Sequence, residues 1–247
     1  MRIDIKIFLF TLLILPTAAL TQTSIPSGTI LSAQLNTSVD SHKLKPGSKV
    51  TARIMQDVPG TKVHSGAKLI GEIVNVDAPK GRPSQITLRF DTIKFKHKLL
   101  HVKTSLRALA SMMEVEDAQT PSVGTDRGSP WAWMPHTLIG GEVAYGQGGP
   151  VVNGGDVVGT SLFGGVLVPA HANPSRGCRG EVDGNNQPQA LWVFASDACG
   201  IYGMNNIRIG HDGRSAPQGE ITLSSREGRF LVRSGSGMLL RVNSNSP

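Results

Sequence analysis

The sequence has few aromatic residues, few charges and only two cysteines. Aromatic side chains make up 5% of the 247 residues and charged side chains 17%, whereas hydrophobic residues reach 39%. A disordered chain combines low hydrophobicity with high net charge, so this composition excludes one and predicts a folded protein. After the first twenty residues no apolar run has the roughly 20 residues that a membrane-spanning helix needs. We therefore expect no transmembrane helix in the mature chain.

No established catalytic or metal-binding pattern is present either. Among the seven histidines only His97 and His101 have the His-x-x-x-His spacing, and no His-Glu-x-x-His motif is present. His97 and His101 are four residues apart, but on a strand or hairpin that spacing does not create a shared metal site. Ser161 follows Gly159-Thr160 but lacks the second glycine of the Gly-x-Ser-x-Gly motif. These absences predict a protein that is not an enzyme and that uses no metal or cofactor.

The first twenty residues have the pattern of a secretory signal. Arg2 and Lys6 precede an apolar run from Ile7 to Leu15, Pro16 ends that run, and Thr17-Ala18-Ala19 offers small residues for cleavage. We predict a signal peptide over residues 1–20, with an uncleaved anchor as the alternative. The expected location is the periplasm, the outer membrane or the extracellular space.

The two cysteines lie in the second half of the chain. An even pair in an exported protein predicts a disulfide between Cys178 and Cys199. The bond would close a loop of about 20 residues and stabilise the fold by about 3 kcal/mol in the chain-entropy model. Two buried free thiols are the alternative.

Charge and glycine divide the chain into two parts. Of the net charge of +7, residues 21–117 carry +6 and residues 118–247 carry none, whereas 23 of the 29 glycines follow residue 117. Such a shift predicts two structural units. We place a basic small β-domain at 24–117, a linker rich in proline and glycine at 118–137, and a second unit at 138–247.

The densest basic run is Lys94-Phe95-Lys96-His97-Lys98. On one strand, Lys94, Lys96 and Lys98 would share a face and form an electrostatic contact surface. The alternative is that the lysines mark a hairpin turn or protect an exposed edge strand. A nucleic-acid partner is not expected, because exported proteins seldom meet nucleic acid.

The first half alternates apolar and polar residues in the manner of β-strands. Turn signals such as Lys45-Pro46-Gly47-Ser48 separate these short stretches. The expected strands cover 29–35, 49–55, 68–76, 86–95 and 99–109, and a short helix is compatible only with 105–115. This pattern predicts a small all-β barrel or sandwich.

Two motifs in this half carry a family resemblance. Ile25-Pro26-Ser27-Gly28-Thr29-Ile30 and the later Gly66-Ala67-Lys68-Leu69-Ile70-Gly71 resemble the C-terminal β-barrel domain of TrbI-type conjugation proteins, the outer-membrane core subunits of type IV secretion systems. The likeness covers residues 25–106, and His64 stands where that family has proline. It implies a β-barrel fold, an envelope location and a subunit of a channel-like assembly. The rest of the chain resembles exported bacterial proteins.

The second half begins with ten glycines among residues 138–168. Paired glycines allow sharp bends, so we expect short strands joined by tight turns, or a segment that touches membrane. The apolar run Ala190–Ala195 predicts a strand buried on both faces. Further strands are expected at 220–224, 229–234 and 238–242, which together make a disulfide-linked antiparallel β-unit.

Two tryptophans precede the glycine-rich segment. Trp131 and Trp133 are two residues apart, so on an extended chain both indoles point to one side. They could form a sugar-stacking platform or a partner contact, or they could cover the junction between the two units.

Together these observations predict a non-enzymatic, exported structural or interaction protein of the envelope. The candidate contact residues are Trp131 and Trp133 with Lys94, Lys96 and Lys98. An envelope protein or a glycan is the expected partner. The alternatives are a glycan- or peptidoglycan-binding module and a subunit of a secretion-channel-like assembly.

Overall fold

The protein is mainly built of β-strands. The computed structural model describes residues 24–79, 81–120, 136–144, 149–153, 156–161, 167–169, 190–210 and 219–243. Within these ranges the strands are accompanied by one short helix, α1 (Met112–Gln119). The expected mainly β composition is therefore confirmed. No helix in the described ranges is long and apolar enough to cross a membrane.

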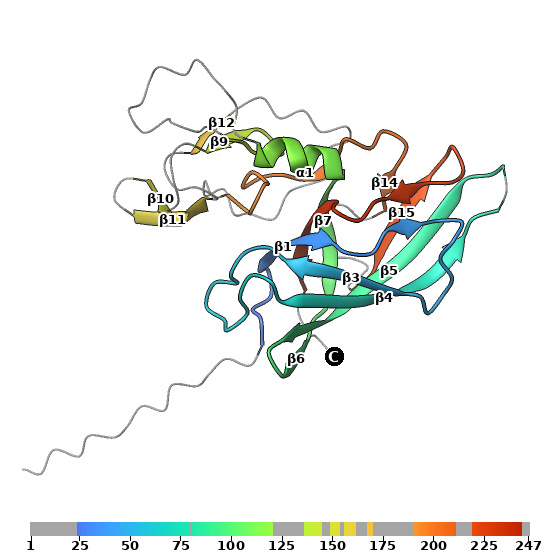
Figure 1. The fold of residues 1–247 in the computed structure, drawn as a ribbon, viewed down its shortest axis with the longest axis horizontal. Coiled ribbons are helices and arrows are strands. Elements are labelled where there is room, and N and C mark those ends of the chain that lie inside the picture. The colour runs from blue at the N-terminus through green and yellow to red at the C-terminus, as the bar shows by residue number, and fades with distance from the viewer. Residues whose placement is uncertain are drawn as a thin grey trace, which may run out of the picture.

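Ten strands form the main sheet (Figure 1). Its order is β13 (Gly200–Tyr202), β7 (Thr104–Ala110), β17 (Gly237–Val242), β1 (Ile30–Leu35), β3 (Lys49–Ile54), β4 (Lys68–Asp77), β5 (Ser84–Phe95), β15 (Ile221–Ser225) and β14 (Arg208–Ile209), with β6 (Lys98–His101) paired to β5. Neighbours are antiparallel, except that β13 runs parallel to β7.

Three smaller sheets complete the described strands. They pair β2 (Val39–Asp40) with β16 (Leu231–Val232), β8 (His136–Thr137) and β12 (Leu167–Pro169) with β9 (Glu142–Ala144), and β10 (Gly149–Asn153) with β11 (Asp156–Ser161). The glycine-rich segment thus contains short strands, as its sequence predicted.

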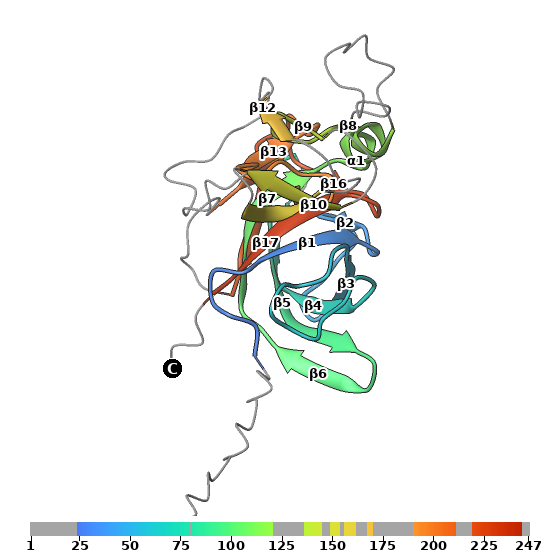
Figure 2. The same ribbon diagram turned by 90° about the vertical axis from the view of Figure 1, so that its left-hand side faces the viewer.

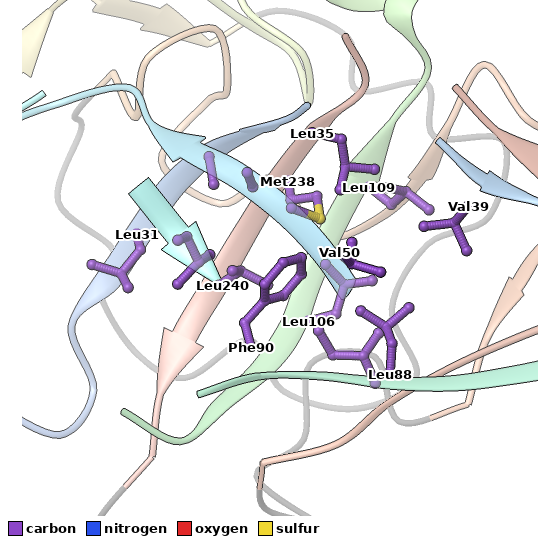
Figure 3. Packing of buried hydrophobic residues seen from close by; sticks show 14 of the residues in the cluster. Leu31, Leu35, Val39, Val50, Leu88, Phe90, Leu106, Leu109, Met238 and Leu240 are labelled. Atoms are coloured by element: carbon purple, nitrogen blue, oxygen red, sulfur yellow. The ribbon is translucent and has the colours of Figure 1, made fainter. Parts of the chain in front are cut away.

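The main sheet curls around one hydrophobic core (Figure 2). Side chains from β1, β3, β5, β7 and β17 meet in its interior, among them the fully buried Phe90 (Figure 3). The curl brings β5 close to the chain that leads into β7, where Val102 N donates to Asp91 O at 2.9 Å. No strand ladder joins β5 to β7 in the described residues. The prediction of a barrel or sandwich is corrected to a single curled sheet that stays open.

Strands from both predicted units share this sheet. β17, near the end of the chain, lies between β1 and β7, and β15 pairs with β5. A side-chain contact adds to these ladders, because Arg229 Nε donates to Asp40 Oδ1 at 3.1 Å across 189 positions of sequence. The hydrogen bonds from Arg229 hold the pKa of Asp40 below the usual value. The first and last parts of the chain therefore fold together.

β7 and β17 are buried on both faces. Their inner side chains, including Leu106 and Leu240, join the main core, whereas Ala108 and Leu239 belong to a second core. That second core also contains Val115 of α1 and the segment 190–195. Small side chains such as Ala108 let the covering segments lie close to the sheet.

The segment 190–195 is buried, but it forms a tight turn rather than the predicted strand. Leu191 and Phe194 exchange two backbone hydrogen bonds of 2.9 and 3.1 Å, and Trp192 has a φ of 60°. Ile139 supplies further backbone partners, donating to Val193 O and accepting from Ala195 N at 2.8 Å each. The backbone is thus paired without a strand, because hydrophobicity alone indicated burial and not conformation.

One residue, Ser111, separates the end of β7 from the start of the helix. Ser111 caps it, with its hydroxyl accepting from Glu114 N at 3.2 Å. Of the stretch 105–115, which is compatible with a helix by sequence, residues 105–110 are strand and residues 112–115 form the start of the helix.

Candidate binding surface

The predicted basic run forms the hairpin between β5 and β6. Lys94 lies near the end of β5, Lys96 occupies the turn with a φ of 50°, and Lys98 opens β6 opposite Phe95. The three lysines are exposed but do not share one strand, which corrects that expectation, because the chain reverses between Phe95 and Lys98. The alternative of a hairpin turn is confirmed. The hairpin extends away from the rest of the sheet (Figures 1 and 2).

The other predicted site residues cannot be placed in the same way. Trp131, Trp133 and Cys178 lie outside the described residues. Cys199 is described, and it is buried beside Tyr202, whose hydroxyl accepts from Cys199 N at 3.0 Å. The disulfide between Cys178 and Cys199 therefore stays a prediction.

Lys94 belongs to a row of three cations that crosses the outer face of the sheet. Arg53 on β3 pairs in register with Lys68 on β4, and Lys68 pairs with Lys94 on β5. All three side chains are exposed, while their neighbours Ala52, Leu69 and Ile93 are buried. We call Arg53, Lys68 and Lys94 the basic row.

No carboxylate among the described residues neutralises the basic row. Its three residues take part in none of the ion pairs between described residues, and Arg53 Nη2 donates instead to the neutral Gln34 Oε1 at 3.1 Å. Residues directly opposite on antiparallel strands have Cβ atoms about 5 Å apart, and like charges at that distance destabilise a sheet. The repulsion within the row therefore lowers the stability of the protein alone, and a bound anion would relieve it.

A second row on the same face has the opposite design. Glu72 lies between Lys49 and Arg89, with Lys49 Nζ at 3.1 Å from Oε2 and Arg89 Nη2 at 2.6 Å from Oε1. Arg89 Nε also approaches Asp91 Oδ2 at 3.5 Å. The hydrogen bonds from Lys49 and Arg89 lower the pKa of Glu72. We call Lys49, Glu72 and Arg89 the paired row.

A bulge between Ile70 and Gly71 sets the register between the two rows. A Cβ atom added at Gly71 would stand 2.0 Å from Arg89 O, so only glycine allows the two backbones to come this close. On the β5 side the bulge adds Asp91, whose carbonyl accepts from Val102 N. Together with a second register shift between Ile73 and Asn75, the bulge aligns Lys68 with Lys94 and Glu72 with Arg89.

The basic row ends at an open groove of about 440 Å³. The turn before β4 forms one side with His64 and Ser65, and the end of β5 forms the other with Phe95 and Lys96. Lys68 and Lys94 line it as well, and none of the described lining residues carries a carboxylate. We call this space the basic groove.

The carboxylate of Asp57, beside this turn, already has hydrogen-bond partners. Asp57 Oδ1 accepts from Ser65 N at 2.8 Å, and Asp57 Oδ2 lies 3.1 Å from His64 Nδ1. These contacts, led by the Ser65 amide, lower the pKa of Asp57. Asp57 therefore fixes the turn that bears His64 and does not neutralise the lysines.

The described residues show no group of His, Cys, Asp or Glu that could hold a metal ion. What this face offers chemically is a set of charge-assisted hydrogen-bond donors for an anionic ligand.

Sequence reasoning found Lys94 and Lys96 but missed Arg53, Lys68 and His64. Each of the missed residues is a single polar position in an alternating or turn segment, which carries no signal of its own. The register across three strands brings them together, and that register depends on the bulge.

Comparison with known proteins adds no identification. No protein-family model matches the sequence, and neither the curated proteins nor the solved structures give a match. The resemblance of residues 25–106 to TrbI-type proteins stays a prediction.

Proposed function

We propose that the protein is an exported, non-enzymatic binding protein of the cell envelope whose basic row holds an anionic glycan. The observation that carries this proposal is the in-register alignment of Arg53, Lys68 and Lys94 without an acidic partner among the residues that the structure describes. The signal-like first twenty residues support an envelope location, where the anionic polymers are glycans.

The spacing of the row suits a polymer. Neighbouring strands are about 4.8 Å apart, so the three cations span about 10 Å along the sheet. Carboxylates on successive sugars of a chain recur over distances of the same order, and a linear polyanion lying across the strands would meet several cations. This arrangement favours a repeating ligand over a single charged group.

The test is binding of the purified chain to polygalacturonate, with uncharged dextran as the neutral polymer. Lys68→Gln/Lys94→Gln removes two charges from the basic row, and Lys49→Gln/Arg89→Gln removes two from the paired row of the same face. At about 1 kcal/mol per cation near an anionic surface, we expect about a thirtyfold loss of affinity in the first variant only. Binding should also weaken steeply with added salt.

Two results would overturn the proposal. One is equal affinity of the wild-type chain for polygalacturonate and dextran. The other is an equal loss in the two double variants, since that would reduce the effect to net charge.

A further inference from the structure

The basic groove has the dimensions of a site for a small ligand. Its volume of about 440 Å³ lies within the range of about 300–1,000 Å³ typical of ligand pockets. Two hydrogen-bonded features bound it, because Asp57 accepts hydrogen bonds from the 64–67 turn and the β5–β6 ladder pairs the strands of the hairpin. The groove is thus formed without a ligand.

Three lysines line this space. Lys68 and Lys94 come from the basic row, and Lys96 comes from the turn. Lys96 has a left-handed backbone, which a side chain other than glycine, asparagine or aspartate adopts rarely and at a cost of about 1–2 kcal/mol. None of the three makes an ion pair with a described residue.

The lysines of the basic groove favour a phosphate monoester over a carboxylate. The groove is lined by lysines, whose ammonium groups act as separate point charges and therefore favour the anion with the larger charge. A phosphate monoester has a charge of about −1.5 to −2 and three acceptor oxygens, enough for three ammonium donors. The half-buried Phe95 and the buried Ala67 offer an apolar surface to the group that bears the phosphate.

The geometry points to the basic groove as a binding site for a phosphate monoester carried by a sugar or by a lipid headgroup. This inference deepens the proposed function and rests on it, because the groove closes one end of the basic row. A phosphorylated terminus of a glycan would enter the groove while its chain follows the row.

The test compares Lys96→Gln with Lys98→Gln. Both lysines are exposed on the same hairpin, but only Lys96 lines the groove. Calorimetry with glucose 6-phosphate should show binding to the wild-type chain and to Lys98→Gln, and about a fivefold loss in Lys96→Gln. Glucuronate, which carries a carboxylate in place of the phosphate, should bind much more weakly.

Vesicles distinguish the source of the phosphate. Retention on phosphatidate vesicles but not on phosphatidylglycerol vesicles, whose phosphate is a diester, would assign the ligand to a lipid headgroup. Binding of glucose 6-phosphate without vesicle retention would assign it to a sugar. Either result supports the inference.

Failure of this inference and failure of the proposed function give different results. Equal affinity for glucuronate and glucose 6-phosphate, or an equal loss in Lys96→Gln and Lys98→Gln, would overturn the phosphate site while polygalacturonate binding stands. If the chain binds glucose 6-phosphate but does not distinguish polygalacturonate from dextran, the phosphate site in the groove is supported and the proposed binding of an anionic polymer is overturned.

Discussion

The basic row and the paired row occupy equivalent places on the sheet but differ in the charge at their centre. Both cross β3, β4 and β5 on the outer face of the sheet, and their central residues Lys68 and Glu72 are four positions apart on β4. Each row has a cation on both outer strands. They differ in the centre, where a carboxylate joins the flanking cations in the paired row and a third cation faces them in the basic row.

This difference shows that stability does not explain the basic row. The paired row shows that the same sheet accommodates an acid between two cations with good hydrogen-bond geometry. An acid at position 68 would give the basic row the same advantage. Under the proposed function, a cation at this position has its advantage when an anion is bound, which is a common compromise between stability and function at binding sites.

The largest effect is expected from breaking the register between the rows. In Gly71→Ala the new methyl group would collide with Arg89 O and with the ring of Phe90, and the strands would have to separate. We expect the free energy of unfolding to fall by about 3 kcal/mol, measured by chemical denaturation. Polyanion binding should weaken as well, because Lys68 and Lys94 would lose their alignment.

Gly47→Ala is the matched control for backbone strain. Gly47 has a φ of 84° but no atom within 4 Å of an added Cβ, so this substitution should cost only about 1 kcal/mol and leave binding unchanged. An equal loss of stability in both variants would show that the close approach at Gly71 does not set the register.

A smaller effect follows from giving the basic row the design of the paired row. Lys68→Glu places a carboxylate between Arg53 and Lys94, and it should raise the free energy of unfolding by up to about 1 kcal/mol. The same change should abolish binding to polygalacturonate. Thermal denaturation and the binding assay measure the two effects on one preparation.

Lys98→Glu serves as the comparison, because it makes the same charge change at an exposed position outside the row. If Lys98→Glu stabilised the protein as much as Lys68→Glu does, relief of general charge repulsion would explain the gain, and the row would have no special energetic role.

The strands of the first half could be predicted from sequence because alternation and turn chemistry agree there. At Lys45–Ser48, for example, Pro46 and Gly47 form the expected turn, with a φ of 84° at Gly47 and Ser48 N donating to Lys45 O at 3.0 Å. Local preference and tertiary structure favour the same conformation in this turn.

The pairing between distant strands could not be predicted in this way. The composition changes near residue 118, yet β17 completes the sheet between β1 and β7, because ladder hydrogen bonds are made by backbone groups and do not depend on composition. The same holds for the candidate site. Lys68 and Lys94 are 26 positions apart, and the two register shifts of the β4–β5 ladder, at Ile70/Gly71 and at Ile73/Asn75, together determine that they face each other.

The smallest expected effect is a difference between the two rows in how their contribution to the free energy of unfolding depends on pH. Because Lys49 and Arg89 lower the pKa of Glu72 below its usual 4.5, the unfolded chain binds more protons than the folded one between these two values. The stabilisation by Glu72 is therefore complete above about pH 4.5 and is lost as the pH falls through the folded-state pKa.

Glu72→Gln should then be less stable than the wild-type chain near neutral pH and equally stable in acid, as measured by urea denaturation across this range. Asp40 and Asp57 are present in both chains, so their own titration cancels in the difference. The basic row contains no carboxylate and should gain such a response only in Lys68→Glu. A Glu72→Gln chain whose stability differs from wild type by a constant amount at every pH would show that the paired row is not held together by charge, and the contrast between the two rows would lose its physical basis.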